Sequence, residues 1–190
     1  AGNLLSDLIR SGAVPTVRLT EVFRQAAQSA IIRSAHQVNE GVVPALKNSS
    51  GQDFFFLRRS DPVAAEETIV ELVGKRLPEN MGIPSHQIQV LSPTRKYDGG
   101  TGSLNRAIQA AVNPPAEDKG ERQFGPFIFR RGDRVMQVKN NYDVMWKTMD
   151  GLEAGMGIFN GDIGHILDVD NRRELITVDF DGHIVEYSPD

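Results

Sequence analysis

Residues 174–187 read ELITVDFDGHIVEY, and apolar and polar residues alternate on both sides of Asp181-Gly182. An Asp-Gly dipeptide between two alternating runs is typical of a two-residue β-hairpin turn. Pairing the runs about this turn sets Val178 opposite Val185 and Ile176 opposite Tyr187, with all four side chains on one face. The stretch therefore predicts an antiparallel hairpin with one apolar face.

Similar short runs precede the hairpin and extend the predicted β-structure. Asn160-Gly161 is a second turn dipeptide. Strands are expected at about 133–138, 162–169, 174–180 and 183–187. Four or five short strands within this length predict a small barrel, entered through a polar linker at 116–122. Residues 151–157 are assigned no role.

The chain before Pro115 has a different periodicity, in which strand-like and helix-like segments alternate. The expected strands are 14–19, 54–57 and 88–91. The expected helices lie between Ala27 and Gly41, after Asp61-Pro62, and from Leu104 to Asn113. This alternation predicts an α/β fold, a parallel sheet with crossover helices, in front of the barrel.

The composition narrows the classes of function. The chain has 190 residues, no cysteine and a net charge of −4. The absence of cysteine suits a reducing compartment, so we expect a cytoplasmic protein, and its short apolar runs predict no membrane span. Residues 148–190 hold ten Asp or Glu against two Arg, a net charge of −8 that would repel nucleic acid from most of this segment.

The sequence contains no pattern for a self-contained catalytic centre. It has no GxxxxGK[ST] phosphate loop (Walker A), no EF-hand order and no partner pattern for a nucleophilic serine. The four histidines never share metal-ligand spacing, which predicts no metal site.

Arg24 is the first candidate functional residue, because it lies where a predicted strand gives way to a helix. Open α/β sheets bind ligands at that edge, and a guanidinium there can contact a γ-phosphate during phosphoryl transfer. The alternative is a surface ion pair with Glu21, three residues earlier.

A second candidate follows the expected strand 88–91. Thr94, Arg95 and Lys96 precede a Gly99-Gly100-Thr101-Gly102 turn. One hydroxyl, two cations and the free amides of the next helix could hold a phosphodiester backbone, although a solvated loop explains the same residues. A further basic group is interpreted as a solvated strand rim: Arg130, Arg131, Arg134 and Lys139.

These residues resemble the RecD-like helicases of superfamily 1, which comprise the alpha subunit of exodeoxyribonuclease V and its stand-alone relatives. The matching segments, in family order, are VRLTEVFRQA (17–26), SAIIRSAHQVNEG (29–41), QVLSPTRKYDGGTGSLNRAIQAAVNP (89–114), GDRVMQVKNNYD (132–143) and FNGDIGHI (159–166). The resemblance implies an ATP- and Mg²⁺-dependent motor with two RecA-like domains that moves on single-stranded DNA, unwinds duplexes and serves DNA repair and recombination.

The resemblance also implies a domain map. Residues 1–13 are expected to be the end of the first motor domain or a linker, 14–120 an incomplete second RecA-like domain, and 121–190 an inserted SH3-like barrel. Because Walker A and B are missing, this chain alone is expected to be inactive and to hold no ATP, with the first motor domain and subunits of a nuclease complex as partners.

Site residues carry over position by position. Arg24 matches the arginine that reaches the γ-phosphate across the cleft, Thr94 and Arg95 match contacts to the DNA backbone, and Asn105 faces the same strand. The alternative is a non-enzymatic module whose acidic barrel recruits a protein partner or binds DNA weakly.

Overall fold

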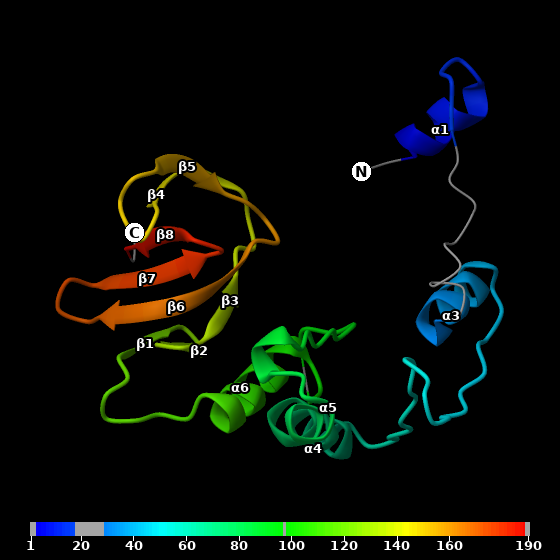
Figure 1. Cartoon of the computed structure of the whole chain (residues 1–190), viewed down its shortest axis with the longest axis horizontal. Helices are drawn as coiled ribbons and strands as arrows, with labels where there is room; N and C mark the ends of the chain where they lie inside the picture. The colour runs from blue at the N-terminus through cyan, green and yellow to red at the C-terminus, as the bar shows by residue number, and fades with distance from the viewer. Residues whose placement is uncertain (1–2, 18–28, 97, 189–190) are drawn as a thin grey trace. The chain divides into compact units, whose positions relative to one another are not determined.

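The computed structural model describes residues 3–17, 29–96 and 98–188. The chain divides into two compact units, Ala1–Arg58 and Arg59–Asp190 (Figure 1). No helix among the described residues is long and apolar enough to cross a membrane. Arg24 lies outside the described residues.

The first unit contains two helices, α1 (Leu4–Ser11) and α3 (Ala30–Asn39). A hydroxyl and a carboxylate together cap α3. Asp53 accepts hydrogen bonds from the Ala30 amide at 2.7 Å and from the Ser29 hydroxyl at 2.5 Å. The Ser29 hydrogen bond, followed by those from the amides of the helix, holds the pKa of Asp53 below its ordinary value.

The strand predicted at 54–57 is wrong. The backbone N–H and C=O of Phe56 are both bonded by the side chain of Asn48, at 2.8 and 2.9 Å. Phe55 and Phe56 stay 52% and 40% exposed, whereas a strand covered on both faces would bury them. The side chain of Asn48 thus makes the two backbone hydrogen bonds that a neighbouring strand would make with Phe56.

The predicted parallel sheet is not found among the described residues, where both sheets are antiparallel. Residues 14–17 and 88–91 are not strands, and Leu91 is 87% exposed; residues 18 and 19 are outside the described part. A strand is stable only with a hydrogen-bonded neighbour, and none of these segments has one within the described ranges.

The second unit begins with one continuous helical segment, consisting of α4 (Pro62–Glu71), the π-helical turn η1 (Leu72–Arg76) and α5 (Leu77–Met81). Asp61 caps it by accepting from the Ala64 amide at 2.8 Å, as predicted. Pro78 explains the wider turn, because it lacks an N–H and its ring displaces the preceding carbonyl groups. The hydroxyl of Ser85, in the 3₁₀ turn η2 (Ser85–Gln87), donates to the Val73 carbonyl at 2.8 Å.

Helix α6 (Thr101–Val112) packs against this segment and confirms the predicted third helix. Leu104 is 3% exposed and Val73 4%. Gly74 faces Ala111 across this contact, where an added Cβ atom would lie 3.7 Å from that of Ala111, an ordinary van der Waals distance.

The rest of the chain is antiparallel β-structure. The hairpin β1 (Glu121–Phe124) and β2 (Phe127–Arg130) lies beside a six-stranded sheet with the order β3-β6-β7-β8-β4-β5 (Figure 1). The sheet contains β3 (Arg134–Met136), β4 (Asn141–Lys147), β5 (Ala154–Ile158), β6 (Ile163–Asp170), β7 (Leu175–Phe180) and β8 (His183–Tyr187).

The predicted hairpin is confirmed in register, with Val178 opposite Val185 and Ile176 opposite Tyr187. The buried core of the barrel consists of apolar side chains from β5 to β8: Ile158, Ile166, Val169, Ile176, Val178, Phe180 and Val185. Strands β1, β2, β4 and β5 were not predicted. Most of β5 falls within 151–157, the segment that was assigned no role.

Candidate nucleic-acid interface

The turn that carries Thr94, Arg95 and Lys96 is tied to the start of α6. The Thr101 amide donates to the Thr94 carbonyl at 3.1 Å. The Ser92 hydroxyl donates to the Gly99 carbonyl at 2.9 Å and lies 3.2 Å from that of Thr94. These bonds hold the turn against the N-terminal end of the helix.

Two glycines let the chain enter α6 at this point. Gly99 has φ +75°, a left-handed conformation that other residues rarely adopt. A Cβ atom on Gly100 would lie 2.6 Å from the Lys96 carbonyl oxygen, so that position requires glycine. The Gly99 amide also donates to the Glu66 carboxylate at 3.3 Å, which joins the turn to α4.

The side chains expected to contact a nucleic acid are exposed. Thr94, Arg95 and Lys96 lie at the surface of the turn, and Asn105 is exposed on α6, four residues after Thr101. Residues four apart share one face of a helix, so Asn105 lies on the same face as the first residue of α6. Gly100 provides no side-chain cap for the helix, and an uncapped N-terminus attracts anions.

The Thr94 hydroxyl makes a hydrogen bond that the sequence does not predict. It donates to the Lys96 carbonyl at 3.1 Å, within the turn itself. A hydroxyl has one proton, so donation to a phosphate would require it to leave this bond. The two cations and the start of α6 are therefore the groups available to an anionic backbone.

The second basic group is not a uniform solvated rim, and that prediction is wrong for Arg130. Arg130 is 5% exposed and bonds the Asn113 carbonyl at 2.6 Å and the Glu121 carboxylate at 2.8 Å. Arg134 donates to the Ile88 carbonyl at 3.2 Å. These two arginines contact the helical part of the unit instead of solvent alone.

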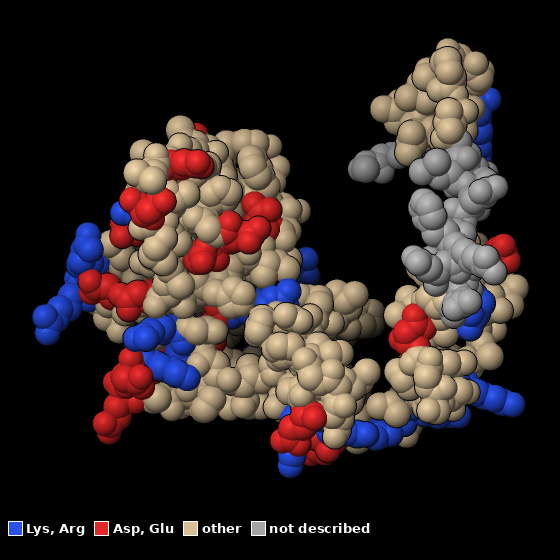
Figure 2. Space-filling model, viewed as in Figure 1, with Lys and Arg blue, Asp and Glu red and all other residues tan. Residues whose placement is uncertain are grey.

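Figure 2 shows red Asp and Glu surface spread over the barrel. This agrees with the net charge of −8 over residues 148–190. Exposed apolar side chains accompany the acidic ones on the β4–β5 hairpin, where Met145 is paired with Met156 and the two are 71% and 61% exposed. Sequence reasoning missed this surface, because β4 and β5 were not recognised as strands.

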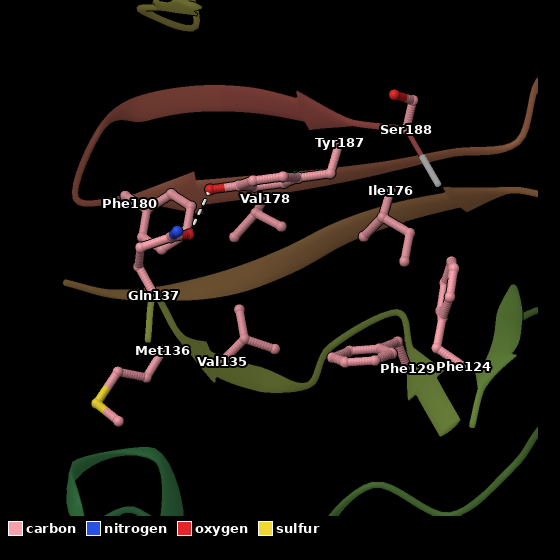
Figure 3. Close-up of a pocket in the computed structure, with 10 residues that line it drawn as sticks. All are labelled: Phe124, Phe129, Val135, Met136, Gln137, Ile176, Val178, Phe180, Tyr187 and Ser188. Carbon is pink, nitrogen blue, oxygen red and sulfur yellow. Dashed lines mark hydrogen bonds between the residues drawn. The ribbon is translucent and has the colours of Figure 1, made fainter. Parts of the chain in front are cut away.

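The barrel also contains an apolar cavity of about 230 Å³ (Figure 3). It lies between the β1–β2 hairpin and the large sheet, and is lined by Phe124, Phe129, Val135, Met136, Gln137, Ile176, Val178, Phe180, Tyr187 and Ser188. The Tyr187 hydroxyl donates to Gln137 at 2.9 Å, and burial raises the pKa of Tyr187. The lining is mostly apolar, so the cavity suits an apolar group.

No set of three or more His, Cys, Asp or Glu side chains is placed to hold a metal ion in the described ranges. His86 and His165 approach each other, with ring centroids 6.2 Å apart. Each belongs to a different layer of the second unit, since His86 is in η2 and His165 in β6.

Comparison with known proteins gives a family match and a similar curated protein. Residues 104–180 match the family described as the ATP-dependent RecD-like DNA helicase SH3 domain. The chain is also similar to the ATP-dependent RecD2 DNA helicase of Deinococcus radiodurans, with 34% identity over 174 residues. That alignment covers 92% of this chain and 21% of the relative, so the chain spans about a fifth of the relative's length.

Proposed function

The chain belongs to the RecD-like helicase family, and we propose that it is the part of an ATP-dependent DNA helicase that grips single-stranded DNA. In this proposal residues 14–120 belong to the second motor domain and 121–190 form its SH3-like barrel, with 1–13 as the link from the first motor domain. The partly exposed segments at 54–57 and 88–91 would pair with further strands of the motor sheet in the full-length protein.

The observation that carries the proposal is the turn at the start of α6. Two adjacent exposed cations, Arg95 and Lys96, precede a helix N-terminus without a side-chain cap. Both features attract a phosphate backbone and neither recognises a base, as a motor that moves along any sequence requires. Asn105, on the face of α6 that begins at Thr101, would contact the same strand, and the Thr94 backbone anchors the turn.

We assign the contact with nucleotide to Arg24. The described residues contain no phosphate loop and no carboxylate cluster that fits ATP or Mg²⁺, so other segments of the full-length protein would hold these groups. Arg24 would approach the γ-phosphate from the second motor domain and stabilise the charge that develops on it. The cysteine-free chain suits this work in the reducing cytoplasm.

Substitution in the full-length protein tests this assignment. Arg24→Ala should abolish ATP hydrolysis and unwinding, while affinity for single-stranded DNA without nucleotide stays unchanged. Arg10→Ala, which removes an exposed arginine at the end of α1, is the matched control and should retain activity. Normal ATP turnover in Arg24→Ala would contradict the assignment.

A second function is favoured by the β4–β5 hairpin. Its exposed Met145 and Met156 share a hairpin with Asp143, Asp150 and Glu153 against one cation, Lys147, and this excess of acid would repel DNA and suit a protein partner. In this alternative the barrel recruits a protein, such as a subunit of a nuclease complex, and the chain binds DNA weakly. A DNA titration of the whole chain separates the two, since no binding at low salt would favour recruitment.

A further inference from the structure

A buried polar cluster joins the end of α6 to the barrel. Asn113 follows the last residue of α6 and is 7% exposed. Its side-chain amide donates to the Asp133 carboxylate at 2.7 Å and to the Arg131 carbonyl at 3.1 Å. Its side-chain oxygen accepts from Lys119 at 2.6 Å. Both the nitrogen and the oxygen of the Asn113 side chain are thus hydrogen-bonded to residues that follow α6 in the chain.

Arg130 and Asp133 complete the cluster from the barrel side. The buried guanidinium of Arg130 donates to the Asn113 carbonyl at 2.6 Å and to Glu121 at 2.8 Å, so its charge has a partner. Asp133 also accepts from the Arg130 amide at 2.8 Å and from the side chain of Gln109, on α6, at 2.5 Å. Asn113 and Arg130 are buried, whereas Gln109 and Asp133 are partly exposed. A network of this kind fixes orientation, because another arrangement would leave its buried polar groups without partners.

A second contact lies on strands β3 and β6. Arg134 donates to the Ile88 carbonyl at 3.2 Å, and His165 meets His86 edge-on. Arg134 and His165 are register partners in the sheet, so they form one contact. A single contact between two parts could act as a pivot, whereas two separate contacts restrict rotation about either one.

We propose that Gln109, Asn113, Arg130 and Asp133 form a rigid joint that fixes the barrel on α6. The Thr94–Lys96 turn is tied to the first residue of the same helix, so the joint makes the barrel and the turn move together. These four are positioning residues, since they act by holding the barrel in one orientation on α6. The meaning of this for DNA translocation rests on the proposed function, but the rigidity of the joint does not.

Distance measurement between spin labels on this 190-residue chain tests the joint. The chain has no cysteine, so Arg106→Cys on α6 and Glu186→Cys on β8 provide two exposed labelling sites. We expect one narrow distance distribution in the parent chain. Asn113→Asp sets two carboxylates against each other. Asp133→Asn replaces an acceptor oxygen by an NH₂ group, which then faces N–H groups that donated to the carboxylate. Each single change should replace the narrow distribution by a broad one.

The exchange of both residues distinguishes a contact from a general loss of stability. In Asn113→Asp with Asp133→Asn, the new amide can donate to the new carboxylate and its oxygen can accept from the Arg130 amide and Gln109. This double variant keeps the net charge but sets an oxygen of the new carboxylate against the Arg131 carbonyl. Its distribution should therefore be narrower than that of either single variant without matching that of the parent chain. A broad distribution in the parent chain, narrow distributions in both single variants, or no recovery in the double variant would each overturn the joint.

A second label pair checks that the barrel stays folded. Labels at Arg172→Cys and Glu186→Cys both lie in the barrel and should give the same distance in all variants. If one of the single variants unfolds the barrel, Gln109→Ala takes its place in the experiment. This change removes one hydrogen-bond donor from Asp133 without adding a charge. A narrow distance distribution in Gln109→Ala would contradict the joint. The experiment contains no DNA or nucleotide, so its failure would leave the helicase proposal intact, and failure to bind DNA would leave the joint intact.

Discussion

Arg95 and Lys96 allow a quantitative test of the DNA-binding proposal. Both side chains are exposed, and neither makes an ion pair with another described residue. For single strands, each phosphate neutralised by a cation adds about 0.7 to the slope of log affinity against log salt concentration. If each cation neutralises one phosphate, Arg95→Ala with Lys96→Ala should reduce that slope by about 1.4.

The size of this change is measurable. Over a fourfold rise in salt, the parent chain should lose about seven times more affinity than the double variant. Fluorescence anisotropy of a labelled oligothymidine, titrated at several salt concentrations, gives both slopes. The effect on affinity should be greatest at low salt, where the parent chain gains most from the release of counterions.

A matched double variant separates a local contact from an effect of net charge. Lys75 and Arg76 are also adjacent, exposed cations in the helical part of the second unit. Their replacement by Ala changes the net charge of −4 to −6, as the test variant does. We expect this control to keep the parent slope. Equal slopes for the test variant and the parent chain would refute the reasoning.

Two further predictions concern stability. Gly100→Ala brings a Cβ within 2.6 Å of the Lys96 carbonyl and should cost about 1–3 kcal/mol in urea unfolding; Gly102→Ala, 3.6 Å from the nearest atom, is the control and should not destabilise. Folding lowers the pKa of Asp53, so its carboxylate contributes to the free energy of unfolding at pH values above its ordinary pKa of 3.8. That contribution is lost as the pH falls through the lowered pKa. Asp53→Asn should remove this part of the acid-induced loss of helical circular dichroism, and an unchanged acid transition would contradict the role of the carboxylate.

The hairpin 174–187 could be predicted because its information is local. A two-residue turn sets the register, and alternation then assigns each side chain to a face. Strands β4 and β5 lack such signals. Their pairing shifts register between Asn141 and Met145, and Gly155 lies directly under the Trp146 ring, which requires knowledge of the neighbouring strand.

For the described residues, the parallel sheet was predicted wrongly because the sequence of a segment does not determine which neighbour it pairs with. Phe54-Phe55-Phe56-Leu57 reads as a strand buried on both faces, but burial depends on neighbours and not on composition. In the described residues the neighbour of Phe56 is the side chain of Asn48. The same limit applies to 88–91, which precedes the candidate site without joining a sheet.

In the described part of the chain, the turn that carries the candidate site forms without the parallel sheet that was expected to support it. Thr94, Arg95 and Lys96 form an exposed turn next to α6, because Ser92 and the glycines that follow fix the turn without a strand. The hydroxyl of Thr94 could not be assigned from sequence. Its acceptor is a carbonyl two residues away, and only the geometry of the turn reveals it.

Asn113 both ends helix α6 and bonds the barrel through its side chain, and the sequence indicates only the first of these roles. Before Pro114-Pro115 it reads as the point where α6 must stop. Its side chain could have faced water, yet it is buried against Asp133 and Lys119. Replacement of a satisfied buried polar network by apolar residues is often neutral for stability, so stability alone does not require these residues. They are better explained by the need for one fixed orientation. A flexible link after α6 would let the barrel turn independently of the Thr94–Lys96 turn, whereas this joint makes any displacement of one end of the helix a displacement of the other.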